Sequence, residues 1–403
     1  MGSRVTREPC FGSDHTQAEV SKKKPKCPNC GSRKTCWYDH QKKQVRDYSC
    51  GHLWVYLELD VGRLKCQECG MVRMEHLAWL AGHPATTKRF ALHIGERCRK
   101  ESIKDVASEF GLDWKRVKEM EMEYMRAQLS ESPEVDPGVI GIDEISVCKG
   151  HEYRIVVSDI EKHRPIWFGG EDRSEESLNQ FYDWLGPEKS KKIRLAVMDM
   201  WKAFENATRA KATDAAILYD KFHVMKHLGE AIDTVRKSEY ARLSGEERSY
   251  IKGQKYNLLS NKENLTLPAK KALKLLLSKN KRLYTAYLLK ESFEQLWDYT
   301  YEGSARTFFD NWKQSLKWQR LKPFEEFANL IDRHWDGIAA YCKPENKNNV
   351  SLGFVEGLNN KIRVFQRRAY GIKDQEYLRL KVLTCMLPKL SKSSTQKGEE
   401  PKK

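Results

Sequence analysis

One stretch of the chain, residues 138–225, constrains the fold most, because short β-branched runs alternate there with amphipathic segments. The continuous apolar run at Ile193–Met198 is typical of a strand buried on both faces of a sheet. Gly186-Pro187 stops the helix that precedes this run. The predicted order is strands at Gly138–Val147, Tyr153–Ile160 and Arg164–Gly169, a helix at Ser174–Leu185, a strand at Ile193–Asp199, a helix at Lys202–Arg209 and a strand at Ala216–Tyr219.

Three successive strands, a crossover helix and further parallel strands form an α/β pattern of the ribonuclease H-like kind. In this plan the first and fourth strands are neighbours. Asp143 lies in the first strand, within Val139–Ile145, and Asp199 ends the fourth. We therefore expect these two carboxylates to lie side by side.

A third carboxylate, Glu356, lies much later in the chain, within Gly353–Arg363, which has helical spacing. Carboxylates are costly to bury and repel one another, so a group gathered from remote segments usually holds divalent metal. Oxygen ligands of this type suit Mg²⁺ or Mn²⁺. Glu144, beside Asp143, points to the opposite face of an ideal strand and is a weaker ligand candidate.

A helical insertion would explain the long gap between Asp199 and Glu356. From about Lys221 to Glu345 strand patterns disappear, and leucines and aromatic residues follow helical spacing. Tryptophans at such positions are predicted to be core residues, and base stacking by one of them is the alternative. The positions concerned are Leu273–Leu277, Trp297, Trp312, Trp318 and Trp335.

Two CxxCG motifs, at residues 27–31 and 66–70, predict a tetrahedral zinc site. The alternation at Val55–Leu59 indicates a hairpin between them, as in a zinc ribbon. Four closed ligands leave no open position for substrate, so the site is expected to be structural. The predicted ligands are Cys27, Cys30, Cys66 and Cys69, with Cys36, Cys50 and His52 as alternatives for one position.

The segment Glu101–Val117 predicts two short amphipathic helices broken at Gly111, an arrangement that resembles a helix-turn-helix. Val117 would pack the second helix against the first. The second helix would then enter the major groove of DNA. A plain helical hairpin packed on the next domain is the alternative. The residues predicted to face DNA are Lys115, Arg116 and Lys118.

Composition agrees with a polyanionic partner. Seventy-two Lys and Arg residues oppose 56 Asp and Glu residues, which gives a formal charge of +16 and makes nucleic acid the first candidate. A generally basic protein without such a partner is the alternative. The 403 residues are enough for about two to four domains.

The sequence has neither a signal-peptide pattern nor a membrane-spanning run. The 11 cysteines are an odd number without secretory features, so reduced thiols and metal ligands in a cytoplasmic protein are expected. The expected domains are a disordered basic N-terminus at 1–26, a zinc ribbon at 27–85, a helix-turn-helix at 86–130, a catalytic domain at 138–225 and 346–388, a helical insertion at 226–345 and a disordered tail at 389–403.

With these motifs in this order, the chain resembles the bacterial insertion-sequence transposases of the ISL-three family. Two departures, Lys221 where Arg is common and Leu352 where Asn is common, remove no proposed ligand. The motifs that carry the resemblance are the two cysteine knuckles, Gly141–Glu144, Lys149–Tyr153, Met198–Met200, Asp220–Val224, Asp233–Arg236, Val355–Ile362 and Arg367–Gly371.

The resemblance implies a DDE enzyme that binds the ends of its element and carries out DNA cleavage and strand transfer. Asp143, Asp199 and Glu356 would be the metal-holding triad, with two ions about 3.5–4 Å apart and Asp143 between them. The DNA partners would be terminal inverted repeats and target DNA. Because two ends must be brought together, a homodimer or larger assembly is expected.

Other residues would support this triad. Asp220 and His223 start a helix directly after the last predicted strand, and His223 could orient a ligand or carry a proton. On the Glu356 helix, basic and amide side chains at helical spacing could grip DNA phosphates, and a solvated basic face is the alternative. They are Asn360, Arg363 and Arg367, with Arg368 beside them.

Two other functions fit the same sequence. A catalytically silent DNA-binding regulator would use the cysteine module and the helix-turn-helix without chemistry. A metal-dependent nuclease would cut DNA without joining it. The presence of all three carboxylates argues against the regulator.

Overall fold

The computed structural model of this chain describes residues 26–51, 53–82, 85–148, 152–343, 352–369 and 371–390. The two chain ends predicted to be disordered fall outside these ranges, except for Lys26 and residues 389–390, and so do His52 and Lys149–His151. Within the ranges, no helix has the length and apolar character needed to span a bilayer.

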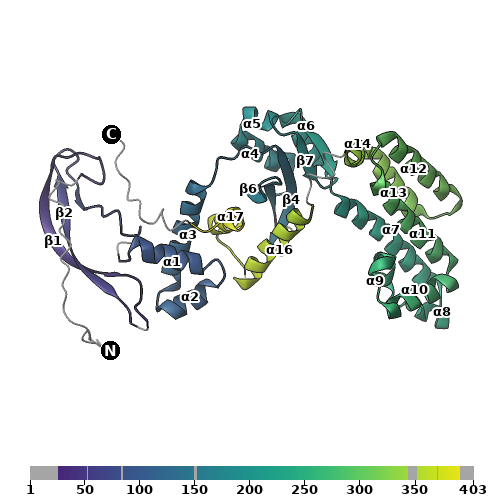
Figure 1. Ribbon diagram of the computed structural model, residues 1–403, viewed down its shortest axis with the longest axis horizontal. Coiled ribbons are helices and arrows are strands. Elements are labelled where there is room, and N and C mark those ends of the chain that lie inside the picture. Colours follow the sequence, from purple (N-terminus) through teal and green to yellow (C-terminus); the bar gives the residue numbers. More distant parts are fainter. Residues whose placement is uncertain are drawn as a thin grey trace. The chain divides into compact units, whose positions relative to one another are not determined.

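The chain divides into two compact units, Met1–Ile94 with Ser391–Lys403, and Gly95–Leu390. The first unit contains an antiparallel sheet in the order β1-β2-β3, drawn in purple in Figure 1. β1 and β2 form the predicted hairpin, and the Trp37 ring of β1 packs over Gly62 of β2, where a Cβ would lie 1.9 Å from the ring. The strands are β1 at Thr35–Arg46, β2 at Tyr56–Cys66 and β3 at Val72–Met74.

Three helices, α1 at Lys88–Arg97, α2 at Ile103–Phe110 and α3 at Trp114–Glu131, follow the first sheet. α2 and α3 are the predicted pair, and Gly111 between them has the left-handed φ of 59°. α3 is longer than the predicted short helix, because its buried face continues through Tyr124 and Gln128. α1 was not predicted.

The second unit is built on a five-stranded sheet in the order β6-β5-β4-β7-β8. β4, β5 and β6 form an antiparallel meander, whereas β7 and β8 run parallel to β4. The predicted neighbouring positions of the first and fourth strands are confirmed by the β4–β7 pairing. The strands are β4 at Val139–Cys148, β5 at Glu152–Asp159, β6 at Arg164–Gly169, β7 at Leu195–Met198 and β8 at Ala216–Tyr219.

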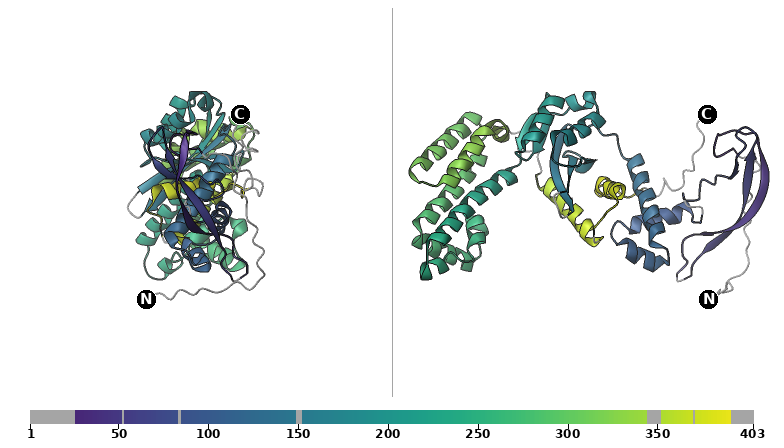
Figure 2. Two further views of the ribbon diagram at one scale, coloured as in Figure 1. Left: turned by 90° about the vertical axis from the view of Figure 1, so that its left-hand side faces the viewer. Right: turned by 180° about the vertical axis from the view of Figure 1, so that it is seen from behind.

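Helices cover both faces of this sheet, as the views in Figure 2 also show. On one face, Ile140 and Val157 pack with Phe181 of α4 and Phe204 of α6. On the other face, Ile145 packs with residues of α16 and α17, including Leu358 and Leu378. The helices are α4 at Glu175–Leu185, α5 at Pro187–Lys191, α6 at Lys202–Lys211, α16 at Leu352–Arg368 and α17 at Gln375–Thr384.

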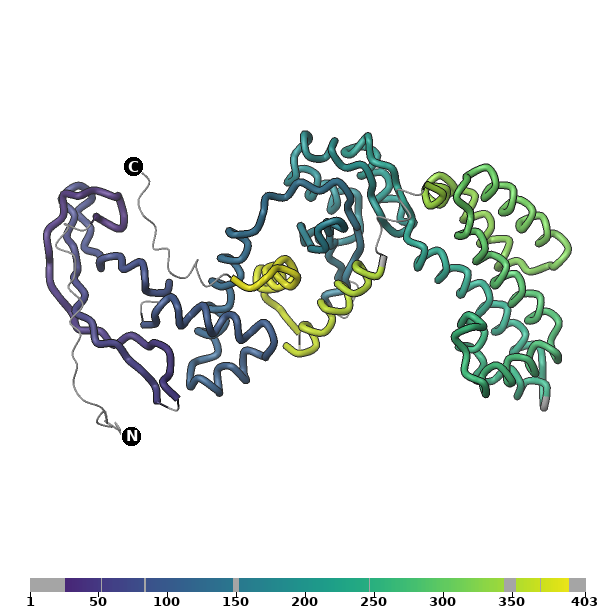
Figure 3. The backbone as a smooth tube through the Cα atoms, viewed as in Figure 1, coloured from purple at the N-terminus to yellow at the C-terminus, as the bar shows by residue number. Residues whose placement is uncertain are grey.

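A long helical segment begins directly after β8 and separates it from α16, as the green part of the tube in Figure 3 shows. Its elements are α7 at Lys221–Arg242, α8 at Gly245–Ser249, α9 at Lys255–Leu259, η1 at Lys262–Asn264, α10 at Leu267–Lys279, α11 at Lys281–Phe293, η2 at Glu294–Asp298, α12 at Glu302–Ser315, η3 at Leu316–Trp318, α13 at Lys322–Arg333, α14 at Trp335–Ala339 and η4 at Ala340–Cys342.

Most tryptophans of this helical segment are core residues, as predicted. Trp297 and Trp312 are buried, and Trp335 packs against the same core. The prediction is wrong for Trp318, which is 86% exposed. Trp318 is the last residue of η3, and it is Leu316, two residues earlier, that this element buries.

Candidate carboxylate and cysteine metal centres

Three aspartates lie at one level across the neighbouring parallel strands. The register pairs Val139 of β4 with Leu195 of β7, and Leu195 with Ala216 of β8. Extending this register along the strands aligns Asp143, Asp199 and Asp220. The β4–β7 pairing agrees with the expectation that Asp143 and Asp199 are neighbours, and Asp220 directly follows the end of β8.

Asp143 is held by groups from its own strand and from α16. Its Oδ1 atom accepts a hydrogen bond from the Glu144 backbone N–H at 2.7 Å, and its Oδ2 atom accepts one from the Asn359 side-chain amide. α16 approaches β4 closely, since a Cβ on Gly141 would lie 3.1 Å from the side chain of Val355. Burial raises the pKa of the Asp143 carboxyl, although the bond from the Glu144 N–H opposes this effect.

Asp199 and Asp220 share a histidine. His223 Nδ1 lies 3.1 Å from Asp199 Oδ2, and its Nε2 lies 4.0 Å from Asp220 Oδ2. The hydrogen bond with Asp199 raises the pKa of His223. Burial alone would raise the pKa of Asp199, but hydrogen bonding to His223 and the charge of that ring leave it lowered. Burial raises the pKa of Asp220, and the charges of Asp199 and Glu356 add to the rise.

Glu356 lies on α16 with an exposed side chain, whereas Phe354, Leu358 and Ile362 of the same helix are buried against the sheet. Its charge acts on Asp220, so Glu356 belongs to the same acidic region. The carboxylates nevertheless form an open arrangement. Across the described ranges, the only group of three or more His, Cys, Asp or Glu side chains with ligand atoms drawn together is a set of four cysteines.

The donor set at the aspartates fits a hard cation. The pKa of Asp143 is raised because burial removes water from a carboxylate, and a bound cation would reverse that cost. The Oδ1 atom of Asn359, whose amide N–H bonds Asp143, is buried and accepts no hydrogen bond in the described part of the chain. Carboxylate and amide oxygens are the ligands that suit Mg²⁺ or Mn²⁺.

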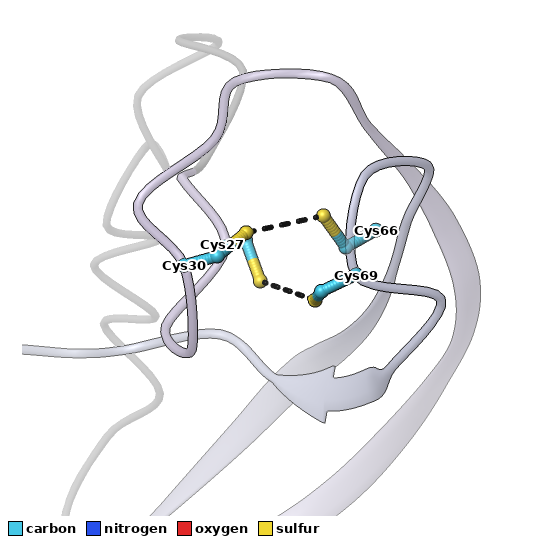
Figure 4. Close-up of side chains that lie close together, drawn as sticks. All are labelled: Cys27, Cys30, Cys66 and Cys69. Atoms are coloured by element: carbon cyan, nitrogen blue, oxygen red, sulfur yellow. Dashed lines mark hydrogen bonds between the residues drawn. The ribbon is translucent and has the colours of Figure 1, made fainter.

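The cysteine cluster lies at the end of the β1–β2 ribbon, and Figure 4 shows its four side chains facing one another. All four sulfur atoms lie within 4.8 Å of one another. The Cys27–Cys69 and Cys30–Cys66 sulfur pairs are 3.8 and 3.5 Å apart. Tetrahedral zinc with Zn–S bonds of about 2.3 Å separates its ligands by roughly 3.8 Å, so these thiols fit zinc.

Backbone amides support the thiolates of this cluster. The Met71 N–H lowers the pKa of Cys69 to about 7, and the Cys30 and Asn29 N–H groups lower that of Cys27. The alternative ligands Cys36 and Cys50 are exposed and not part of the group. The predicted ligand set, Cys27, Cys30, Cys66 and Cys69, is therefore the one that the fold brings together.

Ion pairs join α3 to α17 and to the residue that precedes it. Glu121 of α3 is 1% exposed, forms an ion pair with Lys381 and accepts a hydrogen bond from Tyr377 at 2.5 Å. Lys118, which was predicted to face DNA, instead bonds Asp374 at 2.6 Å. α3 is therefore packed against the sheet domain along one face.

The other predicted DNA contacts lie at exposed or half-buried positions. Lys115 is exposed at the start of α3, and Arg116 beside it is half-buried. On α16, Asn360, Arg363 and Arg367 are exposed, as is Glu356. Arg368 is also exposed and donates a hydrogen bond to the backbone carbonyl of Lys100.

Three contributors to the site had no role in the sequence predictions, namely Asn359, Arg173 and Trp201. Asn359 lies within the Val355–Ile362 motif, and its place three residues after Glu356 could have suggested contact with a metal-holding carboxylate. Arg173 donates to Glu144 at 2.9 Å, and its backbone carbonyl accepts from the Trp201 indole at 2.7 Å. A loop arginine carries no sequence signal for such a contact.

Three family models that describe parts of transposases match successive parts of the chain. A family model described as a transposase matches residues 140–382. A helix-turn-helix domain of transposase family ISL3 matches 75–124, and a zinc-finger of transposases IS204, IS1001, IS1096 and IS1165 matches 23–69.

Relatives that match most of the chain are also described as transposases of insertion sequences. The transposase for insertion sequence element IS1001 of Bordetella parapertussis is 32% identical over 359 residues, covering 88% of this chain and 87% of the relative. The transposase for element IS1557 of Mycobacterium tuberculosis is 28% identical over 385 residues, covering 88% and 84%.

Proposed function

Since this chain belongs to the ISL3 family of insertion-sequence transposases, we propose that it binds the ends of its own element and cuts and joins DNA there by a DDE mechanism. The observation that carries the proposal is the parallel pairing of β4 with β7, together with the hydrogen bond from Asn359 of α16 to Asp143. The register of these strands, extended beyond the paired residues, would align Asp143 with Asp199, and Glu356 lies on the same helix as Asn359. These contacts support a site at which segments remote in sequence would meet.

Asp143, Asp199 and Glu356 would hold Mg²⁺ or Mn²⁺ in this scheme. A bound divalent cation would supply Lewis-acid activation for phosphoryl transfer on DNA. The chain's own part is to keep the carboxylates ionised and oriented. Asn359 and the Glu144 N–H fix Asp143, and His223 fixes Asp199.

His223 and Asp220 would support the proposed metal-holding carboxylates and would not themselves contact the substrate. The imidazole lies between Asp199 and Asp220, so it can hold a proton between two carboxylates. A ring in this position neutralises repulsion between them while no cation is bound. Asp220 also caps α7, because its Oδ1 atom accepts a hydrogen bond from the Phe222 N–H at 2.8 Å.

DNA recognition would be divided among three parts of the chain. The zinc ribbon and the start of α3, with Lys115 and Arg116, would contact the terminal inverted repeat. The exposed face of α16, with Asn360, Arg363 and Arg367, would hold phosphates near the cleavage point, in line with the net charge of +16. Arg368 would extend this surface toward the loop at Lys100.

We also propose a domain organisation for the chain. The sheet order, with three antiparallel strands followed by parallel ones, supports a ribonuclease H-like catalytic domain at 138–225 and 346–388. The all-helical segment supports an insertion at 226–345. The zinc ribbon at 27–85 and the helix-turn-helix at 86–130 would precede them. Synapsis of two ends would make the working form a homodimer or larger, in the cytoplasm where the thiols stay reduced.

One assay separates the candidate functions. Purified protein is incubated with labelled DNA carrying the ends of its own element, with target DNA and with Mg²⁺. Joined products are expected, whereas cuts without joining would indicate a nuclease. Shifted but intact DNA would indicate a regulator, and Asp199→Asn should abolish the chemistry while DNA binding is kept.

A further inference from the structure

An exposed aromatic side chain lies beside each of two aligned carboxylates. Trp201 follows Asp199 by two residues, and Phe222 lies between Asp220 and His223; their rings are 41% and 58% exposed. Two residues span at most about 7 Å of chain. Both rings therefore lie within reach of a nucleotide whose phosphate is held at the carboxylates.

The Trp201 ring is fixed by its neighbours. Its indole N–H donates to the backbone carbonyl of Arg173 at 2.7 Å. The Arg173 guanidinium carbon lies 4.9 Å from this ring and 4.5 Å from the ring of Tyr153, and one of its nitrogens donates to Glu144 at 2.9 Å. The indole N–H of Trp201 thus has its hydrogen-bond partner, and the apolar ring is held partly exposed beside Asp199, a proposed metal ligand.

A ring in this position suits one kind of DNA partner. Inside a duplex the flat faces of each base are covered by the bases above and below it. A protein ring stacks on a base that has left the helix, on one at a strand end, or on one beside a step that has been wedged apart. Stacking tolerates any base, because every base has such a face.

We propose that Trp201 stacks on a base that has left the duplex next to the scissile phosphate, and that Phe222 borders the same site. This inference rests on the proposed function, since it requires DNA at the carboxylates. Arg173 is a positioning residue that holds Trp201 and Glu144 in place. The preferred substrate is therefore an element end that is unpaired at its cleavage point.

Cleavage rates on two forms of the element end test the proposal. One form is fully paired, and the other carries a mismatch at the scissile phosphate. Trp201→Ala should slow cleavage of the paired end about 5- to 100-fold and slow the mismatched end less, because unpairing then costs less. Trp201→Tyr should recover most of the rate. The matched control is Trp184→Ala, which removes a 53% exposed tryptophan from α4 and should cut both ends normally.

A second readout reports the base itself. The fluorescent base 2-aminopurine is placed beside the scissile phosphate, and the non-cleaving Asp199→Asn protein keeps the DNA intact. Removing the Trp201 ring from this protein should raise the fluorescence of the bound DNA, because the extruded base loses its stacking partner. Unchanged fluorescence would overturn the proposal.

The outcomes separate this inference from the function on which it rests. If the wild type cuts neither end, the proposed function fails. If the wild type cuts both and Trp201→Ala cuts both equally well, only the stacking proposal fails. An equal loss on both ends that tyrosine does not restore would also overturn it, since it would indicate a purely structural ring.

Discussion

Asn359 on α16 donates a hydrogen bond to the carboxylate of Asp143 on β4, and this bond joins segments that stand on either side of the long helical region. Asn359 is 8% exposed, and its side-chain oxygen accepts no hydrogen bond from the described residues. Burying an amide whose oxygen lacks a hydrogen bond costs free energy, which points to a role for Asn359 in holding the half-buried carboxylate of Asp143. The pair therefore fixes Glu356's helix at the aspartates.

Replacing Asn359 by Leu keeps the volume but removes the donor. Cleavage by Asn359→Leu should fall about 10- to 100-fold, and more Mg²⁺ should be needed for half-maximal rate, because Asp143 loses its orientation. The control is Asn360→Leu on the exposed face of the same helix. It should weaken DNA binding without changing the Mg²⁺ requirement. An unchanged Mg²⁺ requirement in Asn359→Leu would contradict the role of the pair.

Two lysines of α3 should respond differently to removal. Lys115 is exposed, so Lys115→Ala should weaken binding to any DNA sequence and lower the slope of log affinity against log salt by about 1 if it contacts a phosphate. Lys118→Ala should leave that slope unchanged, because its ammonium is bonded to Asp374. Gel-shift titrations over a range of salt concentrations measure both. A reduced slope for Lys118→Ala alone would reverse the assignment.

The cysteine cluster predicts a metal that stabilises the first unit. Cys66→Ser should lose bound zinc, measured by mass spectrometry of the purified protein, and residues 27–74 should become sensitive to protease, because ion binding supplies the folding energy of such small sites. Cys36→Ser is the matched control, since Cys36 is exposed and outside the cluster. Full zinc content in Cys66→Ser would contradict the ligand set.

We expect acid to lower the stability of the first unit, because it would protonate Asp47 directly after β1. Asp47 is 2% exposed and accepts hydrogen bonds from Arg89 Nε at 2.8 Å and Thr87 Oγ1 at 2.7 Å. The bond with Arg89 holds the pKa of Asp47 below its usual value. A depressed pKa contributes stability that is present above the unfolded pKa of about 3.9 and is lost as the pH falls through the folded value.

Unfolding of this unit by urea, followed from pH 7 to pH 2, should therefore show stability falling below about pH 4. Asp47→Asn should be less stable at pH 7 and show a shallower fall. An acid dependence as steep as that of the wild type would show that another carboxylate controls it.

Much of the sheet could be predicted from local pattern. The apolar run at Ile193–Met198 is long enough for a central strand and too short for a helix, and β6 has the predicted bounds Arg164–Gly169. The neighbouring positions of the first and fourth strands followed from the ribonuclease H-like plan, and this plan led us to expect Asp143 beside Asp199. The cysteine ligands were predictable because the spacing of each pair is set locally.

The remaining features depend on contacts that no local pattern records. The full length of α3 comes from its packing on α17, where Glu121 meets Lys381 across a large sequence separation. Asn359 reaches Asp143 only because α16 returns to β4 after the helical segment. Arg173 lies in a loop, and its place between Trp201 and Glu144 is set by three separate elements.

Three segments of the chain are proposed to meet at one divalent-metal site, and binding of ferrous iron tests this directly. When hydrogen peroxide is added, iron bound in place of Mg²⁺ reduces it to hydroxyl radicals that cut the nearby polypeptide, and the cuts are mapped by mass spectrometry on the DNA-bound protein. Cuts near Asp143, Asp199 and Glu356 together are predicted, all suppressed by excess Mg²⁺ and all lost in Asp199→Asn. Cuts confined to one of these segments would contradict the claim.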